Sequence, residues 1–333
     1  MTEPVRWGVL GAAKFALEYM GRAIHAAEGA ELAALATSSR EKAKSFQAFA
    51  PNLTVFESYD ALLGDPSVHA VYIPLPNSLH VEWTLKAIAA GKHVLTEKPI
   101  AMQADDIDAL ITARDDSALV VSEAYMIVHH PQWQRTRELV QSGAIGKLEF
   151  VDGFFSYDNS ADTANIRNRP ETGGGSLPDI GVYTCGSVRY VTGEEPKVVS
   201  CDIDWENDVD VTAHVTAQFP SFRFQATTSM RHHPRQEMNF HGSDGILRLT
   251  APFNPAVFGQ AEIEIHKNSH SGLVPASVTT ERFPSVNHYV NQVEAFCKSV
   301  RDGAPLAWTL EHAKGTQEML DMAFSSARLR GIK

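Results

Sequence analysis

The chain carries at residues 92–99 the stretch KHVLTEKP. This stretch is typical of a short apolar strand that ends abruptly in an acid, a base and a proline, here Glu97, Lys98 and Pro99. In an open α/β sheet, ligands bind in the crevice just beyond the carboxyl ends of the strands. We therefore expect Lys98 to point into a binding site. The alternative is a solvated Glu97–Lys98 ion pair at a strand end, with no chemical role.

The residues before this stretch predict a helix over 77–91, with a side-chain cap from Asn77 or Ser78 and a stop at Gly91. The apolar run 68–73 predicts another strand, which ends in the loop PLPN at 74–77. Strand, helix and strand form a crossover unit, the building block of a parallel sheet.

The composition bounds the class of protein. A chain of 333 residues is long enough for two domains, and 44% hydrophobic with 21% charged residues is typical of a globular protein. The apolar runs are too short for a spanning helix, and no secretory leader is recognised, so we expect a cytoplasmic protein. The three scattered cysteines suit a reducing compartment. A net charge of −11 argues against nucleic acid or a membrane surface as partner.

The start of the chain predicts a nucleotide-binding turn. Residues 5–10 form a strand that runs into Gly11, after which apolar residues recur at helical spacing. A glycine at such a turn lets the backbone approach a pyrophosphate, whose charge then lies at the amino end of the helix. Only the first position of the glycine fingerprint is glycine, since Ala13 and Ala16 replace the other two.

The end of the second predicted strand, 31–37, favours NADP over NAD. An NAD enzyme would place an acid there for the ribose, whereas this chain has Ser38, Ser39 and Arg40. Hydroxyls and a guanidinium would bind a 2′-phosphate through charge-assisted hydrogen bonds. Alternatively, Ser39 and Arg40 only cap the helix predicted over 41–50.

Further strands over 53–56 and 118–122 bring the predicted parallel sheet to six strands. We therefore predict an N-terminal Rossmann domain, a doubly wound parallel α/β sheet, over residues 1–123. Residues 124–333 are expected to form an α+β domain for substrate binding and oligomerisation, whose C-terminal helices are able to pack back on the first domain. Within it, strict alternation over 209–219 and 222–227 predicts a largely antiparallel open sheet covered on one face.

Three glycines at 173–175 precede a predicted helix that carries Asp179 and Tyr183. Because these residues are four apart, they are expected to share a helix face, with Asp179 in the first turn. The histidine pairs 129–130 and 232–233 suggest a metal. Adjacent histidines on a strand point to opposite faces, and no third ligand is suitably spaced, so no metal site is predicted.

Taken in order, these motifs resemble the glucose-fructose oxidoreductase / inositol dehydrogenase / MocA family over nearly the whole chain. Within it, the alanine-containing turn, the serine–arginine pair, Ile166-Arg167 and a tyrosine in place of the more usual histidine resemble the branch of dimeric dihydrodiol dehydrogenases and NADP-dependent D-xylose 1-dehydrogenases. The chain departs from that branch at residues 127–129, where an arginine is common. The motifs are GVLGAA at 8–13, SSR at 38–40, EKP at 97–99, EAYM at 123–126 with His130-Pro131, and GGG at 173–175 followed by Asp179 and Tyr183.

The resemblance implies a role for each matching residue. Lys98 matches an active-site lysine whose bond to proline is typically cis, Tyr183 the general acid/base, and Asp179 an acid that helps to hold substrate. The implied cofactor site comprises Gly11, Ala13, Lys14, Phe15, Ser38, Ser39, Arg40, Pro74, Pro76, Asn77, Glu97 and Lys98. The expected substrate ligands are Tyr125, His130, Asn165, Arg167 and Asp179.

The leading hypothesis is an NADP-dependent dehydrogenase that transfers hydride between nicotinamide and a secondary alcohol or anomeric carbon of a cyclic sugar or polyol, such as D-xylose at C1. An adjacent ammonium favours the phenolate of a tyrosine, so Lys98 would tune Tyr183 or take the proton itself. The alternatives are a trans-1,2-dihydrodiol dehydrogenase or other sugar-ketone reductase, and a non-catalytic sensor of NADP and sugar. We also expect a homodimer or higher homo-oligomer through the uncovered face of the open sheet, where Thr212, His214, Thr216 and Gln225 are expected to lie.

Overall fold

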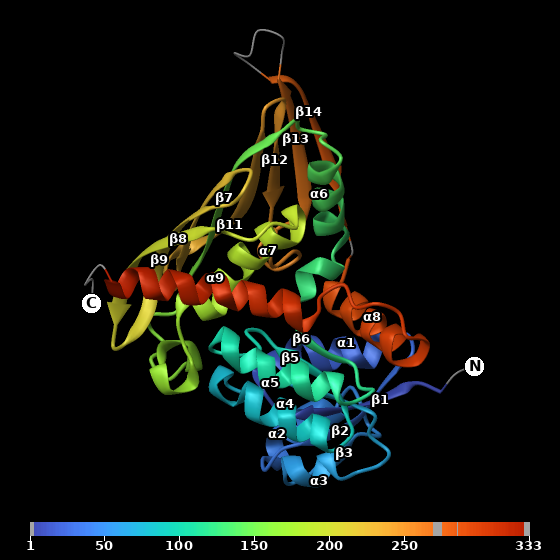
Figure 1. The fold of residues 1–333 in the computed structure, drawn as a ribbon. Helices are drawn as coiled ribbons and strands as arrows, with labels where there is room; N and C mark the ends of the chain where they lie inside the picture. Colours follow the sequence, from blue (N-terminus) through green and yellow to red (C-terminus); the bar gives the residue numbers. More distant parts are fainter. Residues whose placement is uncertain (1–2, 269–274, 285, 330–333) are drawn as a thin grey trace. The chain divides into compact units, whose positions relative to one another are not determined.

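A computed structural model of the chain describes residues 3–268, 275–284 and 286–329. The chain forms two compact units (Figure 1). Unit 1 comprises residues 1–129 and 287–314, and unit 2 comprises residues 130–286 and 315–333. A domain boundary at residue 123 stays a prediction.

Unit 1 is built on six strands in the order β3-β2-β1-β4-β5-β6, and every neighbouring pair is parallel. This is the order of a doubly wound sheet, in which the direction of winding reverses between β1 and β4. The central strands are buried on both faces, which explains their continuous apolar sequences. The strands are β1 (Val5–Leu10), β2 (Ala30–Ala36), β3 (Thr54–Phe56), β4 (Ala70–Ile73), β5 (His93–Glu97) and β6 (Val121–Ala124).

Two apolar clusters pack against this sheet. In one, Trp7 of β1 packs against Phe296 of α8, with ring centroids 5.0 Å apart. In the other, Ile107 and Leu110 of α5 pack with Val94 of β5. A helix from the end of the chain therefore completes the core of unit 1. The helices of unit 1 are α1 (Gly21–Ala26), α2 (Arg40–Gln47), α3 (Tyr59–Leu63), α4 (His80–Ala89), α5 (Ala104–Asp115), α8 (His288–Asp302) and the first residues of α9 (Leu310–Leu329).

Two helices of unit 1 begin differently from the prediction. The helix after Gly11 starts with a π-helical turn, Ala16–Met20, before α1. The helix predicted over 77–91 starts with a 3₁₀ turn, Asn77–Leu79, and α4 begins after Leu79 without a side-chain cap. Its predicted stop is confirmed, because Gly91 has a φ of 73° that suits a residue without Cβ.

Unit 2 contains an eight-stranded sheet in the order β14-β13-β12-β11-β7-β10-β9-β8 (Figure 1). Its neighbouring pairs are antiparallel except for β10 with β7, which is parallel. The strands are β7 (Leu148–Asp158), β8 (Val198–Glu206), β9 (Val209–Gln218), β10 (Arg223–Ser229), β11 (Arg231–Gly242), β12 (Gly245–Thr250), β13 (Glu262–Asn268) and β14 (Pro275–Arg282). The helices α6 (Pro131–Gln141) and α7 (Val182–Thr192) pack against each other in this unit.

The two faces of this sheet differ as the alternation predicts. Ala213, Val215 and Ala217 of β9 are buried, whereas His214 and Thr216 between them are exposed. Thr212 was expected on the exposed face as well, and that expectation is wrong. Its side chain is buried and hydrogen-bonds the hydroxyl of Ser229 at 2.8 Å.

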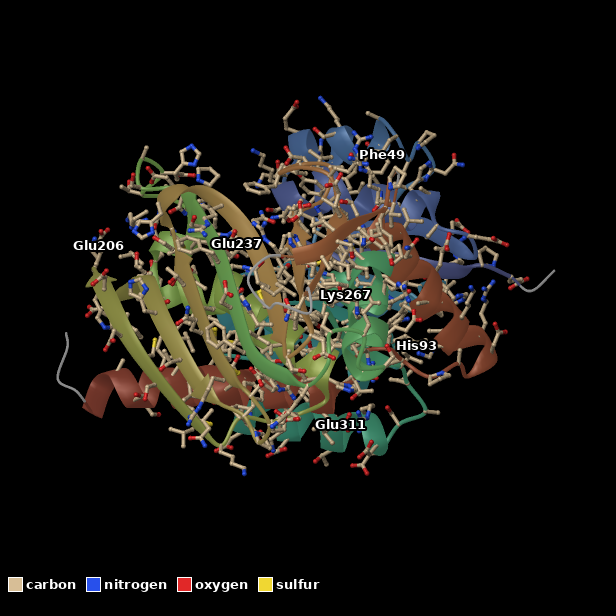
Figure 2. The ribbon with its side chains drawn as sticks, turned by 90° about the horizontal axis from the view of Figure 1, so that it is seen from above. Phe49, His93, Glu206, Glu237, Lys267 and Glu311 are labelled. Atoms are coloured by element: carbon tan, nitrogen blue, oxygen red, sulfur yellow. The ribbon has the colours of Figure 1, made fainter. Side chains whose placement is uncertain are left out.

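Figure 2 shows the strands of unit 2 with their side chains, including Glu206 at the end of β8 and Glu237 on β11. The predicted fold class is confirmed: a parallel doubly wound sheet and a second, largely antiparallel sheet. Strand β14 was not predicted. None of the helices among the described residues is long and apolar enough to cross a membrane.

Candidate active site

The turn after β1 is shaped around Gly11. Its φ is 100°, a conformation that side chains rarely adopt, and its N–H donates to the carbonyl oxygen of Ala36 at 3.0 Å. A Cβ added at Gly11 would come within 3.2 Å of both the Tyr59 hydroxyl and the Leu75 side chain. The following residues include Lys14, whose side chain is exposed. A bare backbone turn at the end of β1, directly before a helix, fits the pyrophosphate of a dinucleotide.

The loop after β2 places the three predicted phosphate ligands at the start of α2. The Ser39 hydroxyl accepts a hydrogen bond from Lys42 N–H at 3.3 Å. Ser39 therefore caps this helix, which is the alternative role predicted from the sequence. Ser38 and Arg40 are exposed beside it. The loop has no acid to repel a 2′-phosphate, and the cap leaves the guanidinium of Arg40 available to solvent. These residues therefore fit NADP.

The loops after β4 and β5 lie on neighbouring strands of unit 1. The Lys98–Pro99 peptide bond is cis, as the resemblance implies. The loop with Pro74 and Pro76 is joined to it by His80, whose buried ring contacts the carbonyl oxygens of Leu75 and Pro99. Sequence reasoning missed His80. Its spacing from Thr84 and Ala87, on the buried side of the same helix, is the signal that could have found it.

Glu97, beside Lys98, lies in a low-dielectric position. Its carboxylate accepts a hydrogen bond of 2.6 Å from the hydroxyl of Tyr72 on β4. Burial raises the pKa of Glu97 to about 7, although this hydrogen bond and the charge of Lys98 act in the opposite direction. The role of Glu97 in cofactor binding stays a prediction.

Glu123, at the end of β6, holds the backbone just after Pro99. One carboxylate oxygen accepts from Ile100 N–H at 2.9 Å and the other from the Trp308 indole N–H at 2.8 Å. Tyr125 stacks on the same indole, with ring centroids 4.3 Å apart, and its side chain is buried in unit 1. Tyr125 was predicted as a substrate ligand, and that role stays a prediction.

Unit 2 carries a polar cluster formed by Asp179, Arg167 and Tyr157. Oδ2 of Asp179 accepts a hydrogen bond from the Tyr157 hydroxyl at 2.6 Å and lies 2.9 Å from Nε of Arg167. The negative charge of Asp179 is the main cause that raises the pKa of Arg167 above its ordinary value. Burial, and then the charge of Asp179, raise the pKa of Tyr157 well above its ordinary value, so its phenol keeps the proton.

Two of these three residues, Asp179 and Arg167, were predicted as substrate ligands, and the structure brings them together. Tyr157 was missed, because it lies 22 residues before Asp179 within a strand whose alternation offers no functional signal.

Tyr183 follows on the same helical segment, in the first turn of α7. Its ring is almost fully buried, with only 7% of the residue exposed, and packs against Phe155 and Phe253. The segment before it, Leu177–Gly181, is a π-helical turn, so the simple four-residue spacing of an α-helix does not hold throughout. Tyr183 also contributes to the raised pKa of Arg167, after Asp179 and Tyr157.

The other two predicted substrate ligands of unit 2 make local contacts. Nδ1 of His130 accepts from Gln132 N–H at 3.1 Å and so caps α6. The Asn165 side chain accepts from Arg167 N–H and donates to Asp162, both at 3.1 Å. Their roles toward substrate stay predictions. Across the described residues, no group of three or more histidine, cysteine, aspartate or glutamate side chains is placed to hold a metal ion.

Asp210 of β9 supports the start of the segment that carries Asp179 and Tyr183. Its Oδ2 accepts from Leu177 N–H at 2.7 Å and from the Ser176 hydroxyl at 3.0 Å. A Cβ at the third glycine, Gly175, would come within 1.9 Å of Oδ1 of Asp210. The glycine therefore allows a buried acid to approach the helix start. Sequence reasoning missed Asp210.

Unit 1 has a six-stranded doubly wound sheet with a phosphate-type turn, and unit 2 carries a buried tyrosine and a paired carboxylate. This combination is typical of two-domain nucleotide-dependent oxidoreductases. Comparison with known proteins identifies the family. Residues 5–125 match the family described as "Oxidoreductase family, NAD-binding Rossmann fold", and residues 133–248 match the GFO/IDH/MocA C-terminal domain.

Individual relatives agree with the family match. The chain is 31% identical to D-xylose 1-dehydrogenase (NADP(+)) 2 of Haloferax volcanii over 96% of this chain and 97% of that protein. It is 30% identical to a dTDP-3,4-didehydro-2,6-dideoxy-alpha-D-glucose 3-reductase of Actinomadura kijaniata, over 98% and 96%. A solved 3-ketoreductase from Actinomadura kijaniata, in complex with NADP and TDP-benzene, superposes with a TM-score of 0.87 at 28% identity, covering 97% of this chain and 98% of that chain. The chain belongs to the GFO/IDH/MocA family of oxidoreductases, which confirms the predicted resemblance.

The raised pKa of Asp210 predicts how stability depends on pH. A folded-state pKa of about 7 exceeds the ordinary value, so the folded state binds this proton more tightly than the unfolded state. The contribution is complete at acidic pH and is lost as pH rises through about 7. Asp210→Asn removes this titration, so the melting temperature of the wild type should fall relative to that of the variant between about pH 5 and pH 8. Thermal unfolding of both proteins across this range provides the measurement. A melting temperature of the wild type that rises relative to that of the variant as pH increases would contradict the prediction.

Proposed function

We propose that the protein is an NADP-dependent oxidoreductase that transfers hydride between the nicotinamide and a secondary alcohol or anomeric carbon of a cyclic sugar. The observation that carries the proposal is the polar cluster of unit 2, where Asp179 is held by Arg167 and Tyr157 close to the buried Tyr183. A carboxylate with its own supporting donors is suited to accept a hydrogen bond from a sugar hydroxyl. A buried phenol is suited to exchange a proton with a neighbouring hydroxyl group of the sugar.

In this proposal Lys98 and Tyr183 act in the proton step, and Asp179 holds the substrate. NADP, when bound, supplies the hydride acceptor, and the residues of this chain bind, orient and deprotonate the alcohol. A phenol with an unperturbed pKa near 10 keeps its proton at neutral pH and is therefore too weak a base. An adjacent ammonium favours the phenolate and so lowers the pKa of the phenol. Either Lys98 tunes Tyr183 or Lys98 takes the proton itself.

A second candidate is reduction of a ketone on a nucleotide-linked deoxysugar. The similarity to the 3-reductase and to the 3-ketoreductase favours it. The same side chains would run the proton step in reverse, with Tyr183 donating to the ketone oxygen. The two candidates share the cofactor and differ in the group carried by the sugar.

The cofactor preference should depend on Arg40. A charge-assisted hydrogen bond contributes about 1.5 to 3 kcal/mol, so Arg40→Ala should lower kcat/KM for NADP by roughly ten- to a hundredfold and leave NAD almost unchanged. Lys44→Ala, which removes an exposed cation from the last turn of the same helix, is the matched control. Steady-state kinetics with both cofactors provide the measurement, and equal losses with NADP and NAD would contradict the role of Arg40.

The proton step should depend on Lys98 and Tyr183. Lys98→Met and Tyr183→Phe are each expected to lower kcat by at least about a hundredfold, because acid/base groups contribute roughly 10² to 10⁴. Cofactor binding, followed by NADPH fluorescence, should survive in both. Tyr157→Phe serves as the control, since it removes a phenol that contacts Asp179 and should act mainly on the KM for substrate. Near-normal turnover in Tyr183→Phe would move the proton role to Lys98 or His130.

The substrate class is tested by a panel. D-xylose and other aldoses, a trans-cyclohexanediol, and a nucleotide-linked 3-ketosugar with NADPH are compared by kcat/KM. Sites that pair hydroxyl groups reject analogues that lack them by up to about 10⁴, so aldoses should exceed the carbocyclic diol by a wide margin. A higher kcat/KM for the diol would favour the hypothesis of a dihydrodiol dehydrogenase, and a higher kcat/KM for the ketosugar would favour the second candidate. Binding of NADP and sugar without any turnover would favour the sensor.

We also propose that the protein assembles as a homo-oligomer, most simply a dimer, through the exposed face of the sheet in unit 2. His214, Thr216 and Gln225 lie on this face, and such polar side chains, none of which is lysine, suit a self-complementary contact. Light scattering at micromolar concentration should give at least the mass of a dimer, and Thr216→Glu should shift the equilibrium toward the monomer through like-charge repulsion. A monomeric mass for the wild type would contradict the proposal.

A further inference from the structure

His80, the first residue of α4, contacts an acceptor with each ring nitrogen. Nδ1 lies 2.7 Å from the carbonyl oxygen of Pro99, and Nε2 lies 2.8 Å from that of Leu75. Neither carbonyl can donate, so each contact is a hydrogen bond only when the ring nitrogen carries a proton. The ring is fully buried, so water cannot replace a missing donor.

The two carbonyls belong to two of the loops that carry predicted functional residues in unit 1. Leu75 lies between Pro74 and Pro76 after β4, and Pro99 directly follows Lys98 after β5. Because β4 and β5 are paired neighbours, one imidazole at the start of α4 contacts both strand ends.

The peptide unit between Pro99 and Ile100 is held from two sides. Its carbonyl oxygen contacts His80, and its N–H donates to Glu123 at 2.9 Å. Glu123 is itself fixed by the indole N–H of Trp308. Both polar atoms of this peptide are therefore held by buried side chains. These contacts fix the backbone directly after Lys98 and Pro99.

We propose that His80 is a positioning residue for Lys98, which it holds in place by donating a hydrogen bond from Nδ1 to the Pro99 carbonyl. This inference rests on the proposed function, since that proposal gives Lys98 its role in the proton step. Burial lowers the pKa of His80, against its two backbone hydrogen bonds, and the charge of Lys98 lowers it further. A neutral ring has one N–H and donates to only one of the two carbonyls, and the inference places that proton on Nδ1, toward Pro99.

Two isosteric substitutions separate the two contacts. The side-chain amide of His80→Asn reaches the place of Nδ1 and keeps a donor for Pro99, whereas that of His80→Gln reaches the place of Nε2 and serves Leu75 instead. Misplacement of a catalytic group by about 1 Å costs about a hundredfold in rate. We expect His80→Gln to lower kcat by roughly ten- to a hundredfold with a smaller change in KM for NADP, and His80→Asn to stay within about threefold of the wild type.

Thr84→Val is the matched control. Thr84 is equally buried on α4, one turn after His80, and its hydroxyl contacts that of Thr96 in β5 at 2.6 Å. Its loss should lower the melting temperature and leave kcat unchanged. Equal losses of kcat in His80→Asn and His80→Gln, in proportion to their losses in melting temperature, would overturn the positioning role. So would a normal kcat in His80→Gln when Lys98→Met is inactive.

A second measurement does not depend on turnover. Long-range ¹⁵N NMR of the histidine rings of the whole protein reports which nitrogen of His80 carries the proton, with His80→Asn identifying the signal. A protonated Nδ1 at neutral pH supports the inference, and an Nδ1 with a lone pair overturns it. If the wild type turns over none of the panel substrates, the proposed function fails, and the NMR result still decides the place of the proton.

Discussion

In unit 1, the loop that bears Lys98 depends on one peptide group, the amide between Pro99 and Ile100, whose two polar atoms are held by buried side chains. A backbone that leaves a parallel sheet loses its ladder partners at the strand end, and buried polar atoms left unbonded there cost about 1–3 kcal/mol each. His80 and Glu123 supply those partners at 2.7 Å and 2.9 Å. The loop that bears Lys98 is thereby fixed by side chains from α4 and β6. These side chains replace the ladder hydrogen bonds that the backbone loses at the end of β5.

In unit 2, the carboxylate of Asp210 provides the partner for backbone at the start of a helical segment. The segment that carries Asp179 and Tyr183 starts after three glycines, with backbone N–H groups that have no partner within the helix. Asp210, from a strand about thirty residues further on, accepts from Leu177 N–H and from the Ser176 hydroxyl. In both units, a side chain proposed for chemistry sits on a short irregular segment that is anchored by a buried polar group from elsewhere in the fold. Precision of the proposed site is thus a property of the anchors as much as of the reacting groups.

The sequence predicts the parts of this arrangement that depend on local pattern. Apolar runs such as 68–73 indicate parallel strands, alternation over 209–219 indicates a half-covered sheet, and Gly11 marks a turn that only glycine suits. The motifs also point to Asp179 and Arg167, which the fold brings to 2.9 Å from each other. The contacts between elements are not local, and so His80, Tyr157 and Asp210 went unnoticed. The burial of Thr212 was missed for a similar reason, because strict alternation cannot show that an end of β9 is covered on both faces.

The buried acids of the two units show why the partners of a carboxylate matter more than its depth. Asp179 lies 2.9 Å from a guanidinium, which offsets the cost of removing its charge from water. Asp210 accepts from Leu177 and Ser176 and Glu97 accepts from Tyr72, all neutral donors, and burial raises the pKa of each acid to about 7. Hydrogen bonds from Leu177, Ser176 and Tyr72 reduce that cost without cancelling it. A carboxylate that is to hold a sugar hydroxyl over a wide pH range therefore needs the cation, and an acid that only anchors backbone does not. This difference is a physical reason to assign substrate contact to Asp179 and support to Asp210.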